Sequence, residues 1–506
     1  MSNKNIYTLF ASRFPADATA VVIETTDGRR WSYRDLDYET ARLARLFHSL
    51  GLRKGERVAV QVDKSPEALF VYLACVRAGL IYLPLNTAYR SQEIAFFIRD
   101  AQPSLFIGRP EVNGEVEILA RCYNIPHAFN LGPDGTGSLL EESRHLATDY
   151  PAVHCTGEDI AALLYTSGTT GQPKGAMLSH DNLASNALTL QTAWGFTATD
   201  VLLHALPLFH AHGLFVASHC ALLSGSKMVF LASFEAPTVV KCLPHVTVFM
   251  GVPTYYTRLL AEPALDRQCC ATLRLFISGS APLREQTFIA FYERTGQRIL
   301  ERYGLTETLM NSSNPLQGRR KPGTVGMALE GVAIRIAADA DQPVGPGEVG
   351  EIQVKGPNVF SGYWRLPERS SEDFTDDGWF RTGDLGKLDD ESYLTIVGRR
   401  KDLIITGGYN VYPKEIESHI DRFPGVHESA VIGLADPDFG ERVVAVVVRT
   451  AADSELTADT LITTLKRSLA NYKVPKTVFF IDELPRNAMG KVQKNVLREQ
   501  LGKQKP

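Results

Sequence analysis

The sequence predicts an α/β fold, in which a large N-terminal domain of parallel-rich sheets with helices precedes a small α+β C-terminal domain. Three observations support this prediction. The chain has 506 residues, which is too many for a single hydrophobic core. Strand and helix signals alternate over residues 20–105, and after Asp402 a compact alternation continues to the C-terminus. We therefore place the domains at residues 1–400 and 401–506.

Capping and turn residues justify the N-terminal elements. Ser32 and Asp35 form the capping-box pattern of a helix start, and Gly51 is a typical stop after the apolar helical positions. Residues 57–62 and 80–85 are short apolar runs of the kind that form buried strands. Because strands alternate with helices here, we expect a largely parallel sheet.

The small domain is predicted in the same way. Pro413 suits the first turn of a helix, and residues 461–470 are predicted to be helical. Residues 429–432, 442–448 and 478–481 are predicted to be strands. This mixture is sufficient for a small α+β domain.

Composition narrows the class of function. The formal net charge is 53 − 57 = −4, which indicates neither nucleic-acid binding nor a polybasic membrane anchor. No run of about 18 apolar residues predicts a membrane span, and no apolar region of a secretory signal follows the first lysine. The seven cysteines include no C-x-x-C pair, so we expect neither a disulfide framework nor a zinc site. These features favour a cytoplasmic protein with reduced thiols and small-molecule partners.

The segment from Tyr165 to Lys174 is the strongest signal in the sequence. An apolar strand leads into a loop of glycine and hydroxyl residues, which are Thr166, Ser167, Gly168, Thr169, Thr170 and Gly171. Glycines let a ligand approach the backbone, and successive N–H groups with hydroxyls favour anions. We predict a polyphosphate site. Pro173 departs from the G-x-x-x-x-G-K-[ST] pattern, and an ordinary flexible loop is the alternative.

Two histidines, His210 and His212, follow a Leu-Pro-Leu-Phe segment. No cysteine or acidic residue lies at ligand spacing, so zinc is not predicted, and a hydrogen-bonded core histidine is the alternative to a ligand-facing one. Residues 251–254 and 278–282 close apolar strands with small residues. Ligands in α/β sheets bind beyond such strand ends, although an ordinary strand-to-helix turn would look the same.

Residues 301–307 supply the groups that a Mg-ATP site needs. Tyr303 offers a face for adenine, Thr306 a hydroxyl for a phosphate, and Glu307 a hard oxygen ligand for Mg²⁺. Further on, Asp384 lies between two tight turns, where a carboxylate can bind both ribose hydroxyls or simply cap the turn.

These motifs, in this order, resemble those of the adenylate-forming enzymes, which include acyl-CoA synthetases, luciferases and peptide-synthetase adenylation domains. The resemblance runs from Trp31 to Lys494. It implies two steps: an acid attacks the α-phosphate of Mg-ATP to give acyl-AMP and pyrophosphate, and coenzyme A then displaces AMP. It also implies an AMP-binding domain over residues 1–400 and a mobile domain over residues 401–506 that carries the catalytic lysine, with Lys401 at the hinge.

The resemblance assigns roles to individual residues. Catalytic roles fall on Thr166, Glu307 and Lys491, with Glu307 as the Mg²⁺ ligand, and coenzyme A passes Gly407 and Gly408. A lysine suits the first step because it neutralises charge on the α-phosphate. The implied ATP-binding residues are Thr166, Ser167, Gly168, Thr169, Thr170, Gly171, Lys174, Ser280, Ala281, Pro282, Glu301, Tyr303, Gly304, Thr306, Asp384, Arg399 and Lys491.

Arg302 is a departure from the wider family pattern, in which members that activate aromatic acids usually have a glycine before this Tyr-Gly. A buried arginine penalises a long apolar acid and favours a short acid with a second carboxylate, which it binds bidentately. The alternative is that it pairs with a structural acid such as Glu301. The surrounding residues resemble the malonyl-CoA synthetases, in which the positions of His210, Arg302, Ser280 and Met310 are expected to bind malonate.

Several alternatives remain open. Of the two histidines, the resemblance to the adenylate-forming enzymes implies that His210, rather than His212, points into the acyl pocket. The same chemistry on methylmalonate, oxalate, acetate or a fatty acid is possible on sequence grounds. A non-catalytic nucleotide-binding protein is the alternative of a different class; loss of Lys491, Glu307 or Asp384 would favour it, and all three are present. We expect a monomer or homodimer, and a lysine acetyltransferase acting on Lys491 would remove the charge that the first step uses.

Overall fold

The computed structural model of the chain describes residues 2–110, 113–167, 173–450, 456–487 and 490–502. The chain divides into two compact units. Unit 1 comprises Met1–Ala333 and Val354–Phe380, and unit 2 comprises Ile334–Gln353 and Arg381–Pro506. Both units combine helices with sheets, which confirms the predicted α/β class. The boundary predicted after residue 400 concerns which part of the chain moves, and it stays a prediction.

One sheet of unit 1 has six strands. Its inner pairs are parallel, and only the last pair, β7 with β8, is antiparallel. Helices α4 and α5 pack their apolar side chains on one of its faces. The strand order is β6 (His127–Asn130), β5 (Leu105–Gly108), β3 (Arg57–Val60), β4 (Ile81–Pro84), β7 (Ile160–Ser167) and β8 (Pro173–Ser179).

The second sheet of unit 1 has nine strands. Strands β9 to β13 are parallel, so their carboxyl ends meet at one edge, and β14 returns antiparallel to β13. Helices α9, α10 and α11 cover one face of β9, β11 and β12. The strand order is β15 (Met327–Ala328), β14 (Leu309–Ser313), β13 (Ile299–Leu305), β12 (Leu275–Ser278), β11 (Val248–Gly251), β9 (Val201–His204), β10 (Lys227–Phe230), β1 (Val21–Thr25) and β2 (Arg30–Ser32).

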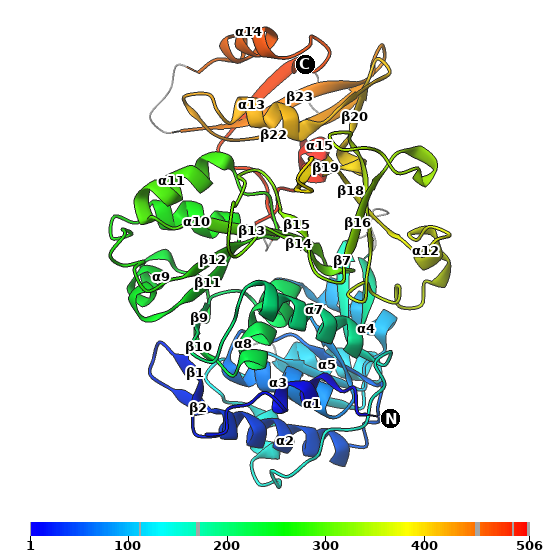
Figure 1. Cartoon of the computed structure of the whole chain (residues 1–506). Helices are drawn as coiled ribbons and strands as arrows, with labels where there is room; N and C mark the ends of the chain where they lie inside the picture. The colour runs from blue at the N-terminus through cyan, green and yellow to red at the C-terminus, as the bar shows by residue number, and fades with distance from the viewer. Residues whose placement is uncertain (1, 111–112, 168–172, 451–455, 488–489, 503–506) are drawn as a thin grey trace. The chain divides into compact units, whose positions relative to one another are not determined.

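Helix α2 of unit 1 begins where the sequence predicts. Ser32 and Asp35 make both hydrogen bonds of a capping box at the start of α2, and α2 packs against α3 (Figure 1). Helix α3 is buried on every side, which explains its almost continuous apolar sequence. The helices are α1 (Ile6–Ala11), α2 (Tyr33–Ser49), α3 (Pro66–Arg77), α4 (Ser91–Ala101), α5 (Asn113–Cys122), α6 (Ser138–Ser143), α7 (His180–Ala193), α8 (Ser218–Ser224), α9 (Ala236–Cys242), α10 (Pro253–Leu260), α11 (Glu285–Thr295) and α12 (Pro367–Glu372), with the π-helix η2 (His212–Ala217) and the 3₁₀ turn η3 (Leu243–His245).

Unit 2 contains two sheets. The four-stranded sheet has the order β16 (Ala333–Ala337), β17 (Gly350–Lys355), β18 (Phe380–Leu388) and β19 (Leu394–Arg399). The five-stranded sheet has the order β21 (Tyr409–Val411), β20 (Ile404–Thr406), β23 (Gly440–Arg449) and β22 (Val426–Asp436), with β24 (Thr477–Ile481) also paired to β23. Its other elements are α13 (Pro413–Ile420), α14 (Ala458–Ser468), α15 (Lys494–Gly502), η4 (Asp339–Asp341) and η5 (Arg400–Asp402).

Both faces of the five-stranded sheet are buried. Successive side chains of a strand point to opposite faces, so Val443 and Val447 pack with α13 and α14 while Val444 and Val446 pack with α15. Figure 1 shows α13 beside β22. The run of valines in β23 therefore fills two cores at once. The observed strand extends beyond the predicted residues 442–448 by Gly440, Glu441 and Arg449, none of which is buried.

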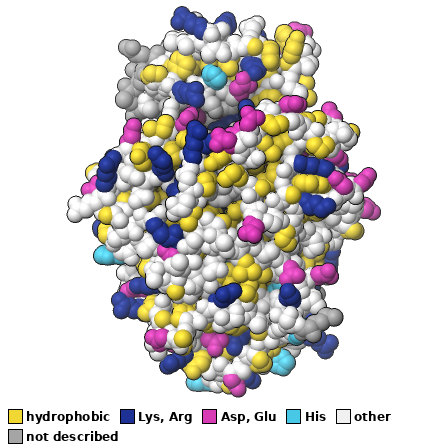
Figure 2. All heavy atoms as spheres, in the orientation of Figure 1, with side chains coloured by type: hydrophobic (Ala, Val, Ile, Leu, Met, Phe, Trp, Pro, Cys, Tyr) yellow, Lys and Arg dark blue, Asp and Glu magenta, His cyan; other side chains and the backbone are white. Residues whose placement is uncertain are grey.

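The surface agrees with the composition. On the face shown in Figure 2, acidic and basic side chains are interspersed and neither sign forms a continuous patch. Among the described residues, no helix is long and apolar enough to cross a membrane.

Candidate functional site

The predicted phosphate loop connects strands β7 and β8, which form a hairpin in unit 1. The register pairs Thr166 with Lys174, which places the first and last predicted phosphate ligands on facing strands. Ser167 ends β7. The predicted contacts of Gly168, Thr169, Thr170 and Gly171 lie outside the described residues. The described part of the hairpin thus holds Thr166 and Lys174 at the two ends of this loop.

Glu307 and Thr166, to which the sequence prediction assigns catalytic roles, are in direct contact. Thr166 Oγ1 donates to Glu307 Oε1 at 3.0 Å, and the Tyr363 hydroxyl donates to the same oxygen at 3.4 Å. The backbone N–H of Phe360 binds the Glu307 carbonyl at 2.8 Å. Residues that are far apart in the sequence therefore meet at one carboxylate, and Tyr363 is a member of this group that the sequence did not predict.

Lys174 is buried, with its ammonium close to two groups from the segment around α12. Its Nζ lies 3.8 Å from Asp373 Oδ2 and 4.7 Å from the centre of the Tyr363 ring. Burial lowers the pKa of Lys174, and the Asp373 carboxylate acts in the opposite direction. An anionic ligand at this hairpin would add a further partner for the ammonium.

Arg302 lies on β13 with its side chain inside unit 1. The residue is 3% exposed, and within the described part of the chain its Nε and Nη2 have no hydrogen-bond partner. Burial lowers its pKa to about 9, so the guanidinium remains charged at neutral pH. An unpaired buried cation is costly, and this arrangement therefore favours binding of an anion.

The pairing of Arg302 with Glu301 that the sequence left open has no support in the geometry. The two residues are adjacent on a strand and so point to opposite faces of the sheet. Glu301 is buried and its Oε1 accepts the Leu283 N–H at 3.1 Å. Glu301 thereby fixes the turn after β12, where the predicted Ala281 and Pro282 lie.

The turn after β12 brings two small residues against Arg302 and His212. A Cβ on Gly279 would lie 2.4 Å from Arg302 Cζ, so only glycine allows the backbone to approach the guanidinium this closely. Ser280 has a φ of +71°, an uncommon conformation for a residue with a side chain. Its Oγ lies 3.3 Å from His212 Nδ1. Strained backbone of this kind is concentrated at functional sites.

His212 is a candidate site residue that the sequence prediction set aside in favour of His210. It is 1% exposed, and its Nε2 has no hydrogen-bond partner among the described residues. Burial lowers its pKa well below the usual value, and the positive charge of Arg302 acts in the same direction. His210 is half-buried, and its Nδ1 accepts the His212 N–H at 3.2 Å. The prediction that His210 faces the acyl pocket stays a prediction, and His212 is added beside it.

The remaining predicted residues of β13 and β14 are closely packed. Gly304 pairs with Met310, and a Cβ on Gly304 would lie 1.9 Å from the Leu309 carbonyl oxygen. Tyr303 and Met310 are buried, and Thr306 is half-buried. The glycine is therefore required by the close approach of the two strands.

In unit 2 the two predicted ribose ligands form a pair. Asp384 and Arg399 are cross-strand neighbours on β18 and β19, and Arg399 Nε lies 2.7 Å from Asp384 Oδ1. The Asp384 N–H also binds Thr382 Oγ1 at 3.1 Å. Lys401 lies in η5 with its side chain exposed. The structure thus brings Asp384 and Arg399 together within one unit.

The predicted coenzyme A passage and the predicted catalytic lysine, Lys491, are also in unit 2. Gly407 and Gly408 are exposed and both have a positive φ, +56° and +80°. Beside them Phe439 is 50% exposed, and Lys476 Nζ lies 5.9 Å from its ring centre. An exposed ring with a nearby cation suits an anionic heteroaromatic ligand. The side chain of Lys491 is exposed.

No group of three or more histidine, cysteine, aspartate or glutamate side chains that could hold a metal occurs in the part of the chain that the structure describes. Mg²⁺ is commonly held by one or two carboxylates together with substrate phosphates. Glu307, which already lies beside Thr166, is the carboxylate that suits this role.

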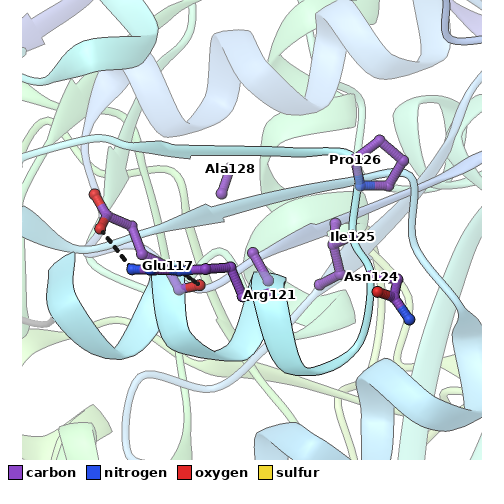
Figure 3. Close-up of a pocket in the computed structure, with 7 residues that line it drawn as sticks. Glu117, Arg121, Asn124, Ile125, Pro126 and Ala128 are labelled. Carbon is purple, nitrogen blue, oxygen red and sulfur yellow. Dashed lines mark hydrogen bonds and ion pairs between the residues drawn. The ribbon is translucent and has the colours of Figure 1, made fainter.

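The pocket in Figure 3 is separate from these groups. It lies between α5 and β6. On its lining, the Glu117 carboxylate accepts a hydrogen bond from Arg121 Nη2 at 3.5 Å. No predicted site residue lines it. We assign it no part in the site.

Comparison with known proteins identifies the class. The model of the AMP-binding enzyme family matches residues 8–364, and that of the AMP-binding enzyme C-terminal domain matches residues 415–491. The chain belongs to the AMP-binding enzyme family.

Individual relatives narrow the comparison. The chain is 49% identical to the ATP-bound MatB of Rhodopseudomonas palustris over 99% of both chains, with a TM-score of 0.97. It is 35% identical to a malonate–CoA ligase of Arabidopsis thaliana, with 94% of this chain and 86% of the relative covered. It is also 35% identical to a feruloyl-CoA synthase of an Amycolatopsis species, with 97% of both covered. The identity to MatB is thus higher than that to either curated relative, and the latter two are equal at 35%.

Proposed function

We propose that this protein is an ATP-dependent malonate–CoA ligase, which forms malonyl-CoA, AMP and pyrophosphate through a malonyl-AMP intermediate. The observation that carries the proposal is the buried guanidinium of Arg302, whose Nε and Nη2 lack partners among the described residues. The similarity to the Arabidopsis malonate–CoA ligase and to the ATP-bound MatB supports the same chemistry.

The distal carboxylate of malonate fits the group formed by Arg302, His212 and Ser280. Arginine binds a carboxylate through two parallel N–H bonds, and Nε and Nη2 form one edge of its fork. When Ser280 Oγ donates to His212 Nδ1, the proton of the neutral ring lies on Nε2 and can be donated to the same carboxylate. Malonate carries the second charge that this site needs, whereas acetate and a fatty acid lack it.

In the first step one carboxylate oxygen of malonate bonds to the α-phosphorus, and the bond from this phosphorus to the bridging oxygen breaks, releasing pyrophosphate. Thr166 and Lys174 bind the phosphates that depart, with the loop between them. Glu307 would hold Mg²⁺, which neutralises phosphate charge when bound. Lys491 neutralises charge that develops on the α-phosphate, and Asp384 with Arg399 binds the ribose.

In the second step the coenzyme A thiolate attacks the carbonyl carbon of malonyl-AMP, and AMP leaves with the electron pair of the broken C–O bond. We propose that the pantetheine arm passes Gly407 and Gly408, and that the exposed ring of Phe439 and the Lys476 ammonium receive the nucleotide end of coenzyme A. Movement of residues 401–506, with Lys401 as the hinge, would let one cleft serve both steps.

Regulation and location are finer parts of the proposal. Acetylation of Lys491 by a lysine acetyltransferase would remove the charge that the first step uses and should spare the second. The seven cysteines are free, which suits a reducing compartment such as the cytoplasm.

The test is pyrophosphate release with Mg-ATP, coenzyme A and a panel of acids, for wild type and for Arg302→Gly. We expect wild type to prefer malonate and the variant to lose malonate selectively. Arg294→Ala is the matched control, because Arg294 binds backbone carbonyls of unit 1 such as that of Leu265 at 2.7 Å. Equal use of malonate by wild type and Arg302→Gly would refute the substrate assignment, and no acid-dependent release with any acid would favour a non-catalytic nucleotide-binding protein.

A further inference from the structure

Described residues on either side of positions 488–489 bind one another around Lys491, and we call residues 486, 487 and 490–492 the Lys491 turn. Arg486 and Val492 form an antiparallel bridge across its base. Both backbone groups of Lys491 bind Asn487: the Lys491 N–H donates to Asn487 Oδ1 at 3.0 Å, and the Lys491 carbonyl accepts the Asn487 N–H at 3.0 Å. The backbone of Lys491 is thus fixed while its side chain is exposed.

Arg486 joins this turn to the core of unit 2. Its Nη1 donates to the Gly490 carbonyl at 2.6 Å, and its Nη2 forms an ion pair with Glu428 on β22. Glu428 is 7% exposed and belongs to the strand that lies between two buried faces. A planar guanidinium can span two acceptors in fixed directions, which a lysine ammonium on a flexible stem does less well. One side chain therefore sets the residue before Lys491 relative to a rigid strand.

A second ion pair holds the other end of the segment. Lys494 Nζ lies 2.6 Å from Glu417 Oε1, and this oxygen also accepts the Val431 N–H at 2.9 Å. Both side chains are largely buried. The two cations that flank Lys491 are thus each paired with an acid of the unit 2 core, and neither ion pair involves the Lys491 ammonium.

We propose that Arg486, through Glu428, is a positioning residue that sets the place of Lys491 for the adenylation step. The inference rests on the proposed function, because it assumes that Lys491 acts in that step. Catalysis by an oriented charge is sensitive to small displacements, and a misplacement of about 1 Å can reduce the rate on the order of 100-fold. Glu428 is the buried member of the pair, so removal of Arg486 leaves a buried carboxylate without this cation, and the turn should shift when either member is removed.

The experiment measures the two half-reactions separately, with the full-length protein. Adenylation is followed as pyrophosphate release from ATP and malonate, and thioester formation as malonyl-CoA made from supplied malonyl-AMP and coenzyme A. The variants are Arg486→Lys, Arg486→Ala, Glu428→Gln and Lys491→Ala, with Lys473→Ala as the control. Lys473 pairs with Glu415 at 2.7 Å in the same unit and does not contact the Lys491 turn. A thermal melt shows whether each variant is folded.

We expect Arg486→Lys, Arg486→Ala and Glu428→Gln to reduce adenylation roughly 10- to 100-fold while changing thioester formation less than about threefold. Lys491→Ala should reduce adenylation further, and adding Arg486→Ala to it should cause no additional loss, because there is no ammonium left to position. Equal loss in both half-reactions, or additive loss in the double variant, would overturn the positioning role.

The failure of this inference can be distinguished from failure of the proposed function. If Lys491→Ala alone leaves adenylation unchanged, the catalytic role of Lys491 is wrong and the positioning role falls with it. If Lys491→Ala impairs adenylation but the Arg486 and Glu428 variants behave like Lys473→Ala, only the positioning role is wrong.

Discussion

A methyl group on Gly279 would collide with the guanidinium of Arg302. The added Cβ would lie 2.4 Å from Cζ, 2.5 Å from Nε and 2.6 Å from Nη1, whereas ordinary contacts begin at 3.4 Å. The guanidinium would therefore have to move by about 3.4 − 2.4 = 1.0 Å. The change is a clean one, because Gly279 does not have the positive φ that would strain an alanine.

We predict that Gly279→Ala reduces kcat/KM for malonate roughly 10- to 100-fold, which corresponds to about 1.4–2.7 kcal/mol of transition-state stabilisation. The KM for ATP should change little, since Arg302 is proposed to bind the acid and not the nucleotide. Steady-state pyrophosphate release at varied malonate and varied ATP measures both constants.

The matched control is Gly345→Ala, where the nearest atom to the added Cβ is a Glu348 oxygen at 3.4 Å and no collision arises. A Gly279→Ala protein that keeps its full kcat/KM for malonate would refute the placement of Arg302 at the acid. An equal loss for malonate and for ATP would show a general disturbance of unit 1 rather than a displaced carboxylate ligand.

Three further predictions concern other parts of the molecule. Glu307→Gln should reduce pyrophosphate release on the order of 100-fold and raise the Mg²⁺ concentration needed for half-maximal rate, because the carboxylate beside Thr166 is lost; an unchanged Mg²⁺ dependence would contradict its role. Asp384→Ala should raise the KM for ATP and leave that for malonate unchanged, since Asp384 and Arg399, which pair on β18 and β19, are proposed to bind the ribose and not the acid; steady-state titrations of ATP and of malonate distinguish these outcomes. Burial lowers the pKa of His180 to about 4. Between pH 6.5 and 4 the unfolded chain therefore binds a proton at this residue that the folded chain does not. The free energy of unfolding should fall as the pH drops from 6.5 towards 4, by up to roughly 3 kcal/mol from His180. His180→Asn, whose amide oxygen can replace the ring nitrogen that accepts the Ile6 N–H, should flatten this part of the unfolding curve in urea melts; an unchanged slope would refute the assignment.

Regular elements could be predicted from sequence because their signals are local. The capping box of Ser32 and Asp35 and the apolar runs of β3 and β4 depend on residues within one element, and each formed close to its predicted place. The exception is the length of β22 and β23. Their central residues are buried on both faces and show no alternation, and end residues such as Asp436, Gly440 and Arg449 are not buried and carry no apolar signal.

The composition of the two compact units could not be predicted in the same way. The boundary that the sequence places at residue 400 concerns the mobile domain and stays a prediction, whereas the compact unit that contains the C-terminus also includes residues 334–353 and 381–400. They do so because β16 to β19 form one sheet from segments that are interrupted by residues 354–380. Such strand pairing is set by contacts between residues that are distant in the sequence, and local sequence patterns do not predict these contacts.

Within the site, residue types were predictable and partners were not. Thr166, Glu307, Asp384 and Arg399 were named by motif, and the structure brings them together in two pairs. His212 was passed over because the family match pointed to His210, and the π-helix that His212 opens has no sequence signal that would have drawn attention to it.

Two acidic residues are so far in the sequence from the basic residues they contact that no motif spacing predicts the contact. Asp373 meets Lys174 across the fold of unit 1, and Glu428 meets Arg486 across that of unit 2. A single sequence carries no record of such pairs, although the acidic residues themselves are visible in it.

The central claim is that this chain selects malonate, and competition between acids tests it most directly. The protein is supplied with Mg-ATP, coenzyme A and equal concentrations of malonate, acetate, ferulate and a long-chain fatty acid, and the thioesters formed at early times are quantified by mass spectrometry. The buried, charged acid site predicts that malonyl-CoA dominates the products by at least about tenfold, since rejection of an acid that leaves a buried charge unpaired is worth more than 1.4 kcal/mol. A product mixture dominated by feruloyl-CoA or a fatty acyl-CoA would contradict it.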